Sequence, residues 1–304
     1  MDIALSGPHP VNKIGATLFH DDWHISRTNY WPAPIEQIIG REHDIGNSSG
    51  TLHAETACIL NAPAATEGAA LCITDPFCPN CAKNIAEAGI KMIYIDHKGF
   101  GKDFFRRRGG DFETMSMRIC THAGISVYKL RRDEKSIETI YEPPSDFMPP
   151  EDSPLQLKEL EDAGEDAFRH HIEAAAALHK RRKFSLCFAR NKDGQIYCLT
   201  ARAHPVTGYT MTDPEEALDL LTPIGKYSFI QEPVNRMLMA CARRGLKIMQ
   251  NYFYCSQVPT SREQVNLVGA GLKRITIGDM ERCRDRWGHV ALRQLDQAGI
   301  LQYF

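Results

Sequence analysis

The sequence carries one helix-to-strand element twice, and this repetition constrains the fold more than any other feature. Residues 77–95 read FCPNCAKNIAEAGIKMIYI, and residues 259–277 read PTSREQVNLVGAGLKRITI. When the two stretches are aligned, AGI-K-x-I matches AGL-K-x-I. Both halves also close alike, with Ala-Gly-Ile before a strand at residues 123–125 and 298–300. Because these matches recur in the same order, we predict an internal duplication that gives two domains of one fold.

A proline-rich connector separates the two predicted domains. Prolines crowd residues 143–154 among acidic and small residues, and such a segment is stiff and extended. We therefore predict an N-terminal domain at residues 1–147 and a C-terminal domain at residues 154–304. A chain of 304 residues is long enough for each domain to bury its own core.

Each predicted domain alternates short apolar strands with helices. The elements predicted in the first half are strands at residues 12–19 and 23–29, a helix at 54–62, a strand at 69–74, a helix from 79, a strand at 91–95, a helix at 112–122 and a strand at 125–130. In the second half, Ser153 and Pro154 resemble a helix start, so residues 155–181 are predicted as one long helix before strands at 183–190 and 195–202. Alternating strands and helices favour parallel strand pairing, so the predicted class is α/β.

Composition limits the partners of this chain. With 36 basic and 38 acidic residues, the overall charge does not favour a polyanion or a membrane surface. The basic clusters at residues 106–108, 180–183 and 243–244 are predicted to be solvated surface. No apolar run approaches the roughly 20 residues of a membrane span, and the first residues lack a signal-peptide pattern. We therefore expect no membrane partner and a cytoplasmic location. The ten scattered cysteines fit a reducing compartment.

Four residues of the first half form a candidate catalytic centre. His53 and Glu55 lie in TLHAETACIL, and Cys78 and Cys81 lie in DPFCPNCAK. Two cysteines three apart on the first turn of a helix can face one ion beyond the helix end. Imidazole and thiolate are ligands that zinc prefers, and three protein ligands leave a fourth position for water. The sequence therefore predicts one catalytic zinc per chain, with His53, Cys78 and Cys81 as ligands.

A C-x-x-C pair alone also occurs in structural zinc sites and redox proteins. Here Glu55 of the H-x-E motif precedes Cys78 by 23 residues, with a predicted helix and strand between them. This combination favours a catalytic zinc over the two other interpretations.

H-x-E followed by C-x-x-C is the pattern of zinc deaminases that act on nucleobases. The first half resembles the cytidine and deoxycytidylate deaminase superfamily over nearly its whole length. The run CAKNIAEAGIK, followed by Asp96 and Lys98, is most similar to the deoxycytidylate branch. The resemblance implies three-layer α/β/α domains, each with a mixed sheet of about five strands, and a site at the starts of two helices.

The resemblance also implies the role of each site residue. Glu55 is expected to be the general acid and base. The backbone amide of Ala54 is expected to contact the ring carbonyl of the substrate. Asn29 stands just after the second strand, where the family holds its substrate, although asparagine is also common there as a turn residue.

One departure from the family pattern lies directly before the first zinc ligand. The family has proline at that position, whereas this chain has Phe77, with Pro76 one place earlier. We therefore predict that Phe77 reshapes the wall against the substrate ring.

The second half has lost the ligand types. In the alignment, Ile230 corresponds to His53, Glu232 to Glu55, Thr260 to Cys78 and Glu263 to Cys81, while Arg202 corresponds to Asn29. Threonine and isoleucine cannot replace a thiolate and an imidazole, so we predict no zinc in this half. Its expected role is that of a partner subunit in an intrachain pseudo-dimer, and further homo-oligomerisation is left open.

The function predicted from the sequence is zinc-dependent hydrolytic deamination, most simply of cytosine in a nucleotide or nucleoside. Guanine or adenine compounds are alternative substrates. An editing deaminase acting on RNA or single-stranded DNA is a second alternative, which the near-neutral charge does not favour. A non-catalytic zinc-binding module is the third.

Overall fold

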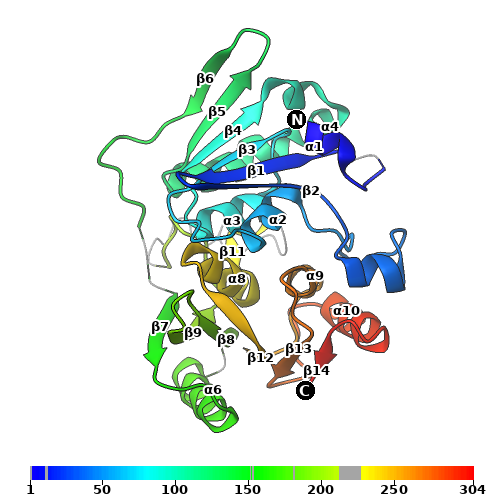
Figure 1. Cartoon of the computed structure of the whole chain (residues 1–304), viewed down its shortest axis with the longest axis vertical. Coiled ribbons are helices and arrows are strands. Elements are labelled where there is room, and N and C mark those ends of the chain that lie inside the picture. The colour runs from blue at the N-terminus through cyan, green and yellow to red at the C-terminus, as the bar shows by residue number, and fades with distance from the viewer. Residues whose placement is uncertain (1, 11–12, 151, 153, 181, 212–226) are drawn as a thin grey trace.

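The computed structural model describes residues 2–10, 13–150, 152, 154–180, 182–211 and 227–304. Within these residues the chain forms two six-stranded sheets and a small ribbon of β10 (His204–Pro205) and β11 (Ile230–Gln231). The two large sheets lie at opposite ends of the molecule, with helices packed between them (Figure 1). The predicted α/β class is confirmed, and each large sheet has six strands where about five were expected.

The first sheet has the strand order β2-β1-β3-β4-β5-β6. Its strands are β1 (Gly15–His20), β2 (Trp23–Thr28), β3 (Ala70–Ile73), β4 (Met92–Asp96), β5 (Ser126–Arg131) and β6 (Ser136–Tyr141). The central strands β3, β4 and β5 are parallel, whereas β1, β2 and β6 pair antiparallel with their neighbours. The sequence did not predict β6, because this edge strand is exposed and lacks an apolar alternation.

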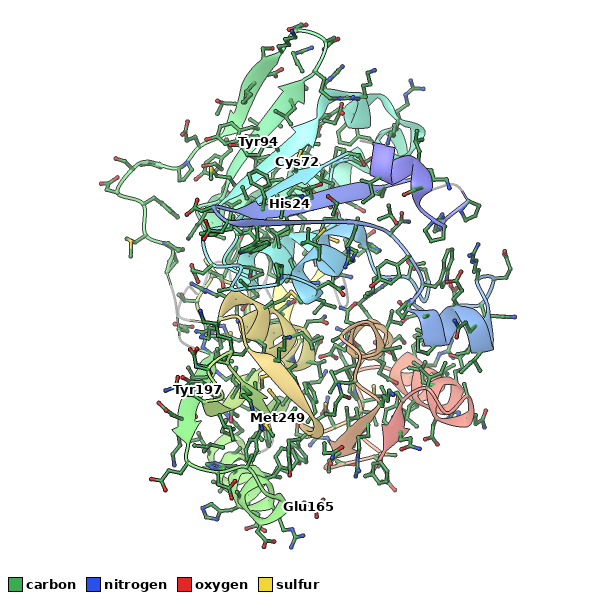
Figure 2. The ribbon with its side chains drawn as sticks, viewed as in Figure 1. His24, Cys72, Tyr94, Glu165, Tyr197 and Met249 are labelled. Atoms are coloured by element: carbon green, nitrogen blue, oxygen red, sulfur yellow. The ribbon has the colours of Figure 1, made fainter. Side chains whose placement is uncertain are left out.

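The two faces of the first sheet differ in burial. One face is fully buried against the helix layer. Its side chains include a row across four neighbouring strands, formed by Leu18, Leu71, Ile93 and Val127. The opposite face carries a row of stacked rings, Phe19 on Tyr94 and Tyr94 on Tyr128, and includes Cys72 and His24 (Figure 2). Alternation along each strand therefore directs one set of side chains into the core between the sheets.

The second sheet has the strand order β14-β13-β12-β8-β9-β7. Its strands are β7 (Leu155–Leu160), β8 (Phe184–Arg190), β9 (Ile196–Arg202), β12 (Lys247–Cys255), β13 (Arg274–Ile277) and β14 (Gln302–Tyr303). Phe184, Leu186 and Phe188 alternate along β8 and belong to a buried cluster with Phe168 of α6 (Glu165–His179). The intervening Cys187 and Ala189 belong to the core that the two halves share.

The two sheets share one arrangement of five strands. In the first, β1 and β2 form a hairpin, β3 pairs antiparallel with β1, and β4 and β5 follow in parallel. In the second, β8 and β9 form the hairpin, β12 pairs antiparallel with β8, and β13 and β14 follow in parallel. The sixth strand differs, because β6 extends the first sheet beside β5 whereas β7 extends the second sheet beside β9.

Helices fill the space between the sheets and cover parts of their outer surface. The helical segments of the first half are α1 (Asp2–Ser6), η1 (Ile35–Ile39), α2 (Ala54–Leu60), α3 (Pro79–Glu87), η2 (His97–Gly101), α4 (Asp103–Asp111), η3 (Phe112–Ser116) and α5 (Met117–His122). Within the described part of the second half, the helices besides α6 are α8 (Pro233–Arg243), α9 (Ser261–Gly269) and α10 (Arg286–Gln297). The helix predicted at residues 112–122 thus begins earlier, at Asp103, and includes a π-helical turn. Among the described helices, none combines the length and apolar character that a bilayer span requires.

The long helix predicted at residues 155–181 is wrong in its first part. Residues Leu155–Leu160 form β7, which pairs antiparallel with β9, and α6 begins only at Glu165 after the N-cap Gly164. Leu155, Leu157 and Leu160 fit a helical spacing as well as an edge strand, and the free edge of β9 decides between them. The predicted N-cap Ser153 lies outside the described residues.

The repeated Ala-Gly element has a conformational cause. Gly89 follows the C-cap Ala88 of α3 with φ 72°, and Gly271 follows the C-cap Ala270 of α9 with φ 82°. A left-handed residue there ends a helix and turns the chain toward the next strand, and glycine adopts this conformation without a Cβ clash. The repeat therefore marks the same helix end in both halves.

The two halves are joined by a shared core and a buried ion pair. α3 of the first half packs on α8 of the second, and apolar residues from both belong to one buried cluster. Within this contact, Arg236 Nη1 of α8 lies 2.7 Å from both carboxylate oxygens of Glu87 of α3. Arg236 Nη2 donates to the carbonyl oxygens of His204 and Pro205, so the guanidinium is held on two sides.

We predict that Glu87→Gln destabilises the folded chain by about 3–5 kcal/mol, because it leaves the buried Arg236 charge without its counterion. Urea unfolding followed by intrinsic fluorescence measures the loss. Glu113→Gln, at an exposed position of the same half, is the matched control and is expected to leave the urea midpoint unchanged. Equal midpoints for the two variants would contradict the prediction.

Candidate active site

The candidate site lies where α2 and α3 begin. His53 is the N-cap of α2, with extended backbone angles, and Glu55 lies in the first turn of the same helix. Cys78 is the N-cap of α3, Pro79 follows as the first helical residue, and Cys81 lies on the first turn. Proline suits the first helical position because it needs no backbone donor there. The two helix starts therefore present His53, Cys78 and Cys81 toward one point.

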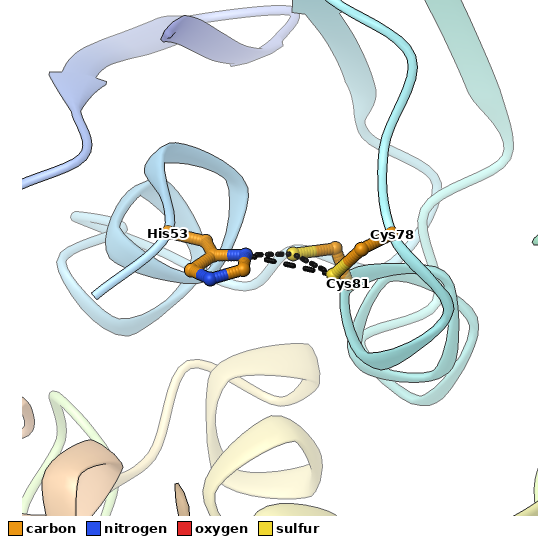
Figure 3. A group of neighbouring side chains, drawn as sticks. All are labelled: His53, Cys78 and Cys81. Carbon is orange, nitrogen blue, oxygen red and sulfur yellow. Dashed lines mark hydrogen bonds between the residues drawn. The ribbon is translucent and has the colours of Figure 1, made fainter. Parts of the chain in front are cut away.

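The three candidate ligand atoms form a compact triangle (Figure 3). His53 Nδ1 lies 3.2 Å from Cys81 Sγ and 3.5 Å from Cys78 Sγ, and the two sulfur atoms are 3.7 Å apart. A tetrahedral zinc with its usual bond lengths separates such atoms by about 3.5–3.8 Å. The three residues thus fit a zinc ion, and among the described residues they form the group able to hold a metal.

The electrostatics of the triangle favour a thiolate at Cys78. The hydrogen bond with Cys81 lowers the pKa of Cys78 well below its ordinary value, against the effect of burial, and the charge of His53 adds to this. Burial acts to lower the pKa of His53, but the Cys78 thiolate outweighs it and raises that pKa. A thiolate is the form of cysteine that binds metal ions.

Glu55 is a buried carboxyl group beside the ligands. Glu55 is 3% exposed, and burial raises the pKa of Glu55 to about 7, with the Cys78 thiolate acting in the same direction. The charge of His53 opposes this shift, which places Glu55 within electrostatic reach of the ligand triangle. A carboxyl group in these surroundings can both take up and release a proton near neutral pH.

The three residues predicted to contact the substrate are all buried. Ala54 is the first residue of α2, where backbone N–H groups have no acceptor within the helix. Asn29 follows β2 and is 5% exposed, and its Oδ1 accepts a hydrogen bond from the Ile14 amide. Phe77 is buried with its ring edge-on to Phe112 at 5.4 Å. The predicted substrate roles of these three residues stay predictions.

The second half contains a corresponding pair of helix starts. Glu232 is the N-cap of α8 and Thr260 is the N-cap of α9, with Glu263 on the first turn of α9. By position on the helices, Glu232 therefore corresponds to His53, and the alignment of Ile230 with His53 is wrong by two residues. Thr260 and Glu263 correspond to Cys78 and Cys81, as the alignment predicted.

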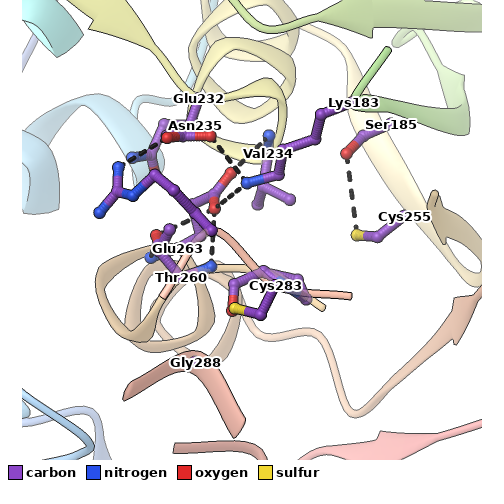
Figure 4. Close-up of polar contacts among 12 residues, drawn as sticks. Lys183, Ser185, Glu232, Val234, Asn235, Cys255, Thr260, Glu263, Cys283 and Gly288 are labelled. Atoms are coloured by element: carbon purple, nitrogen blue, oxygen red, sulfur yellow. Dashed lines mark hydrogen bonds and ion pairs between the residues drawn. The ribbon is translucent and has the colours of Figure 1, made fainter. Parts of the chain in front are cut away.

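A lysine ammonium group lies between these residues (Figure 4). Lys183 Nζ is 2.7 Å from Glu232 Oε2 and 3.1 Å from Glu263 Oε2. Glu263, which is fully buried, also accepts from the backbone amides of Thr260 and Val234. Arg284 Nη1 pairs with the other oxygen of Glu232 at 2.6 Å. The Lys183 ammonium group thus connects the starts of α8 and α9 in the second half. In the first half, the side chains of His53, Cys78 and Cys81 meet between the starts of α2 and α3.

The sequence pattern did not predict the role of Lys183. The cluster at residues 180–183 was predicted to be solvated surface, but the Lys183 side chain is only 11% exposed. The basic run around Lys183 does not indicate which residues Lys183 contacts, because Glu232 and Glu263 lie 49 and 80 residues further along the chain.

The chain is similar in sequence to a known protein that is named a deaminase. No family model matches the chain. Over 125 residues it is 36% identical to a protein named "Uncharacterized deaminase in luxG 3'region" from Aliivibrio fischeri, a match covering 41% of this chain and 83% of that protein.

Two solved structures of dCMP deaminase from the cyanophage S-TIM5 are also similar. The apo form is 21% identical with a TM-score of 0.28, covering 42% of this chain and 88% of the other. The complex with dCMP and dUMP is 20% identical with a TM-score of 0.28, covering 41% and 87%.

We predict that Lys183→Met destabilises the chain by about 3–5 kcal/mol, because the buried Glu263 carboxylate then loses its cation and Glu232 keeps only Arg284. Adding Glu263→Gln to this variant is expected to restore part of the loss, since one of the two charges disappears. Urea midpoints of the single and double variants measure both effects, with Lys192→Met in the exposed β8–β9 turn as control. A single variant as stable as this control would contradict the prediction.

The pH dependence of this cluster has a defined sign. Burial acts to raise the pKa of Glu232, but Lys183 and Arg284 outweigh it and lower the pKa from 4.5 to about 2. A lowered pKa in the folded state stabilises the fold above the unfolded value and loses this effect as pH falls through the folded value. The stability difference between wild type and Lys183→Met is therefore expected to shrink between pH 4.5 and about 2.

Proposed function

This chain belongs to the cytidine and deoxycytidylate deaminase superfamily, and we propose that it hydrolyses the exocyclic amine of cytosine in a nucleotide or nucleoside, with zinc as cofactor. The chain is a hydrolytic deaminase; the substrate and the metal are the proposed part. The observation that carries the proposal is the triangle of His53, Cys78 and Cys81 with the buried Glu55 beside it.

Zinc, when bound by His53, Cys78 and Cys81, supplies a Lewis acid that lowers the pKa of water to about 7. Glu55 then does the proton chemistry. Its carboxylate accepts a proton from the attacking water as the water oxygen bonds to C4, and delivers that proton to ring atom N3. It then takes the proton of the new C4 hydroxyl group and delivers it to the amine at C4. The C4–N bond breaks and ammonia leaves, which gives uracil. The burial of Glu55 keeps bulk water from exchanging these protons.

The helix start provides the reason to prefer cytosine. The Ala54 amide suits a ring carbonyl on the carbon that one ring nitrogen separates from the amine-bearing carbon, which cytosine has at C2. Adenine offers no such carbonyl, so this donor would stay unpaired at a cost of about 1–3 kcal/mol. Asn29 is proposed to hold the ring or the sugar from the end of β2. Guanine keeps a carbonyl, which makes it the second candidate base.

We also propose that residues 154–304 form a degenerate copy of the deaminase domain at residues 1–147. The shared order of five strands and the matched helix starts support this. Lys183 takes the place of a metal in the second copy, which therefore needs none. Through α8 this copy covers the apolar faces of α2 and α3 and acts as an intrachain partner subunit.

The proposed activity is tested by an ammonia-release screen over cytosine, guanine and adenine as bases, nucleosides, nucleotides and oligonucleotides. We expect release from a cytosine nucleotide or nucleoside. Glu55→Gln is the matched variant, because it keeps the shape of the side chain and removes its acid–base function. It is expected to lower kcat by about 10² or more while the metal stays bound. Release from guanine or adenine compounds alone would refute the substrate, and a Glu55→Gln enzyme with kcat within a few-fold of wild type would refute the role of Glu55.

Elemental analysis tests the metal. We expect one zinc per chain in the wild type, and loss of zinc after Cys78→Ser combined with Cys81→Ser, since two thiolate ligands are gone. Cys72→Ser, on β3 outside the site, is the control and is expected to keep the metal. Two zinc ions per chain, or full zinc content in the double variant, would show that the ligands are misassigned.

A further inference from the structure

A cleft of about 760 Å³ lies between the C-terminal end of α6 and the edge of the second sheet. α6 covers the face of this sheet that points away from the first half, and the cleft lies beside β7 and β9 (Figure 1). Its lining comes from the start of β7, the end of β9, the end of α6 and the turn after α6. The described residues that line it include Gln156, Leu178, His179, Lys180, Arg182 and Arg202.

Three of these side chains are cations without a carboxylate partner. Lys180 and Arg182 are exposed and Arg202 is half-buried, and among the described residues none of the three forms an ion pair. Asp152 lies within electrostatic reach of Arg202, but its Oδ2 is paired with His204 Nε2 at 2.9 Å. The side chains that line the cleft therefore carry a net positive charge, which attracts anions.

His179 adds a ring nitrogen to this lining. Its Nε2 atom is shielded from solvent and has no hydrogen-bond partner among the described residues. Burial lowers the pKa of His179, and the charges of Arg202 and Arg182 act in the same direction, so both cations lie near the ring. Buried polar atoms normally have a partner, and a ligand oxygen that reaches the ring would supply one.

A second cavity of about 150 Å³ continues the cleft along α6. The two cavities share Gln156 and Leu178 in their linings, and the smaller one adds Lys158. Lys158 follows Gln156 by two residues on β7 and stands opposite Cys198, so both side chains point to the face that α6 covers. Among the described residues, no acidic side chain lines either cavity. The positive lining therefore extends from the end of α6 along β7.

The turn that carries two of the cations has an unusual backbone. Lys180 is the C-cap of α6, with φ 52° and ψ −112°. Residues with a Cβ rarely adopt a positive φ, and the strain persists only where the surroundings impose it. Strained residues of this kind cluster at ligand-binding sites, which fits a turn that positions Lys180 and Arg182 at the cleft.

Charge and shape indicate the class of ligand. A chain of phosphate groups places several negative charges within a short length, and a guanidinium pairs with phosphate through two parallel hydrogen bonds. The volume of the cleft lies in the range of small-molecule sites. No Phe, Tyr or Trp among the described residues lines it, so it offers none of the stacking platforms that single-stranded nucleic acids use. These observations favour recognition of phosphate groups over recognition of bases.

We propose that this cleft is a binding site for a ligand with two or three linked phosphate groups, held by Lys180, Arg182 and Arg202. The site lies on the opposite face of the second sheet from the core that the two halves share, so it is separate from the candidate active site. The inference goes beyond the proposed function, because it requires neither the metal nor deamination. It gives the second half a binding role of its own.

Calorimetry with inorganic triphosphate tests the site on the full chain. We expect saturable binding to wild type, and about tenfold weaker binding to Arg182→Gln and to Arg202→Gln, because each variant loses a charge-assisted pair. Arg202→Lys is expected to lie between wild type and Arg202→Gln, since it keeps the charge and loses the fork. Arg190→Gln, at the exposed end of β8 outside the cleft, is the matched control and should bind as wild type does.

Hydrogen exchange on the wild type locates the site without any variant. Triphosphate is expected to slow amide exchange at residues 154–158, 178–180 and 198–202 and to leave α10 unchanged. Protection confined to the starts of α2 and α3 would place the ligand at the candidate active site and overturn the proposal. This measurement decides the question even where the urea midpoint shows that a variant folds poorly.

Further titrants separate the sources of the phosphate chain. Inorganic triphosphate that binds at least as tightly as adenosine triphosphate indicates a free oligophosphate, and tighter binding of adenosine triphosphate indicates a phosphate ester; both support the site. Binding of an oligoglutamate peptide without binding of triphosphate would assign the cleft to an acidic peptide and overturn the proposal. It is overturned as well if wild type does not bind triphosphate at millimolar concentration, or if wild type, Arg182→Gln and Arg202→Gln bind it equally.

Discussion

The convergence of two helix starts on one point is the constraint on which the rest of this structure depends. α2 and α3 both begin at the same end of the first sheet, so their N-caps His53 and Cys78 meet although 25 residues separate them. The partial positive charge of each helix start favours anionic groups there. A thiolate at Cys78 and a carboxyl group at Glu55 therefore lie in a place where the backbone field and burial both act on their protonation.

The same constraint recurs in the second half with a different solution. Glu232, Thr260 and Glu263 occupy the corresponding helix positions, and the ammonium group of Lys183 lies between the two carboxylates. The ammonium group places positive charge between these two carboxylates, as the proposed zinc would among the thiolates of the first half. An ammonium group offers no position at which water binds as it does to a metal, so the second half is proposed to keep the geometry of the site without its chemistry.

The two halves are coupled through the elements that carry these groups. α3 and α8 pack directly, Glu87 and Arg236 form a buried pair across the contact, and Arg262 holds the carbonyl of Thr51 in the segment that leads to His53. The hydrogen bond of Arg262 to Thr51 thus ties the second half to the chain two residues before the candidate ligand His53. This arrangement gives a physical reason for keeping a second half that lacks the three ligand types.

Local elements and candidate ligands could be predicted from the sequence alone. Fixed spacing on a helix turn is a local property, so His-x-Glu and Cys-x-x-Cys predicted the chemistry, and the Ala-Gly helix ends predicted the repeated unit. Features that depend on a contact with a residue far away in the chain became clear only from the tertiary structure. The strand Leu155–Leu160 forms because β9 offers a free edge, and the match of Glu232 to His53 follows from the helix cap. Lys183 meets Glu232 and Glu263 only when the second half folds, and Arg262 meets Thr51 only when the two halves pack. Such contacts join residues far apart in the chain, and no spacing in the sequence encodes them.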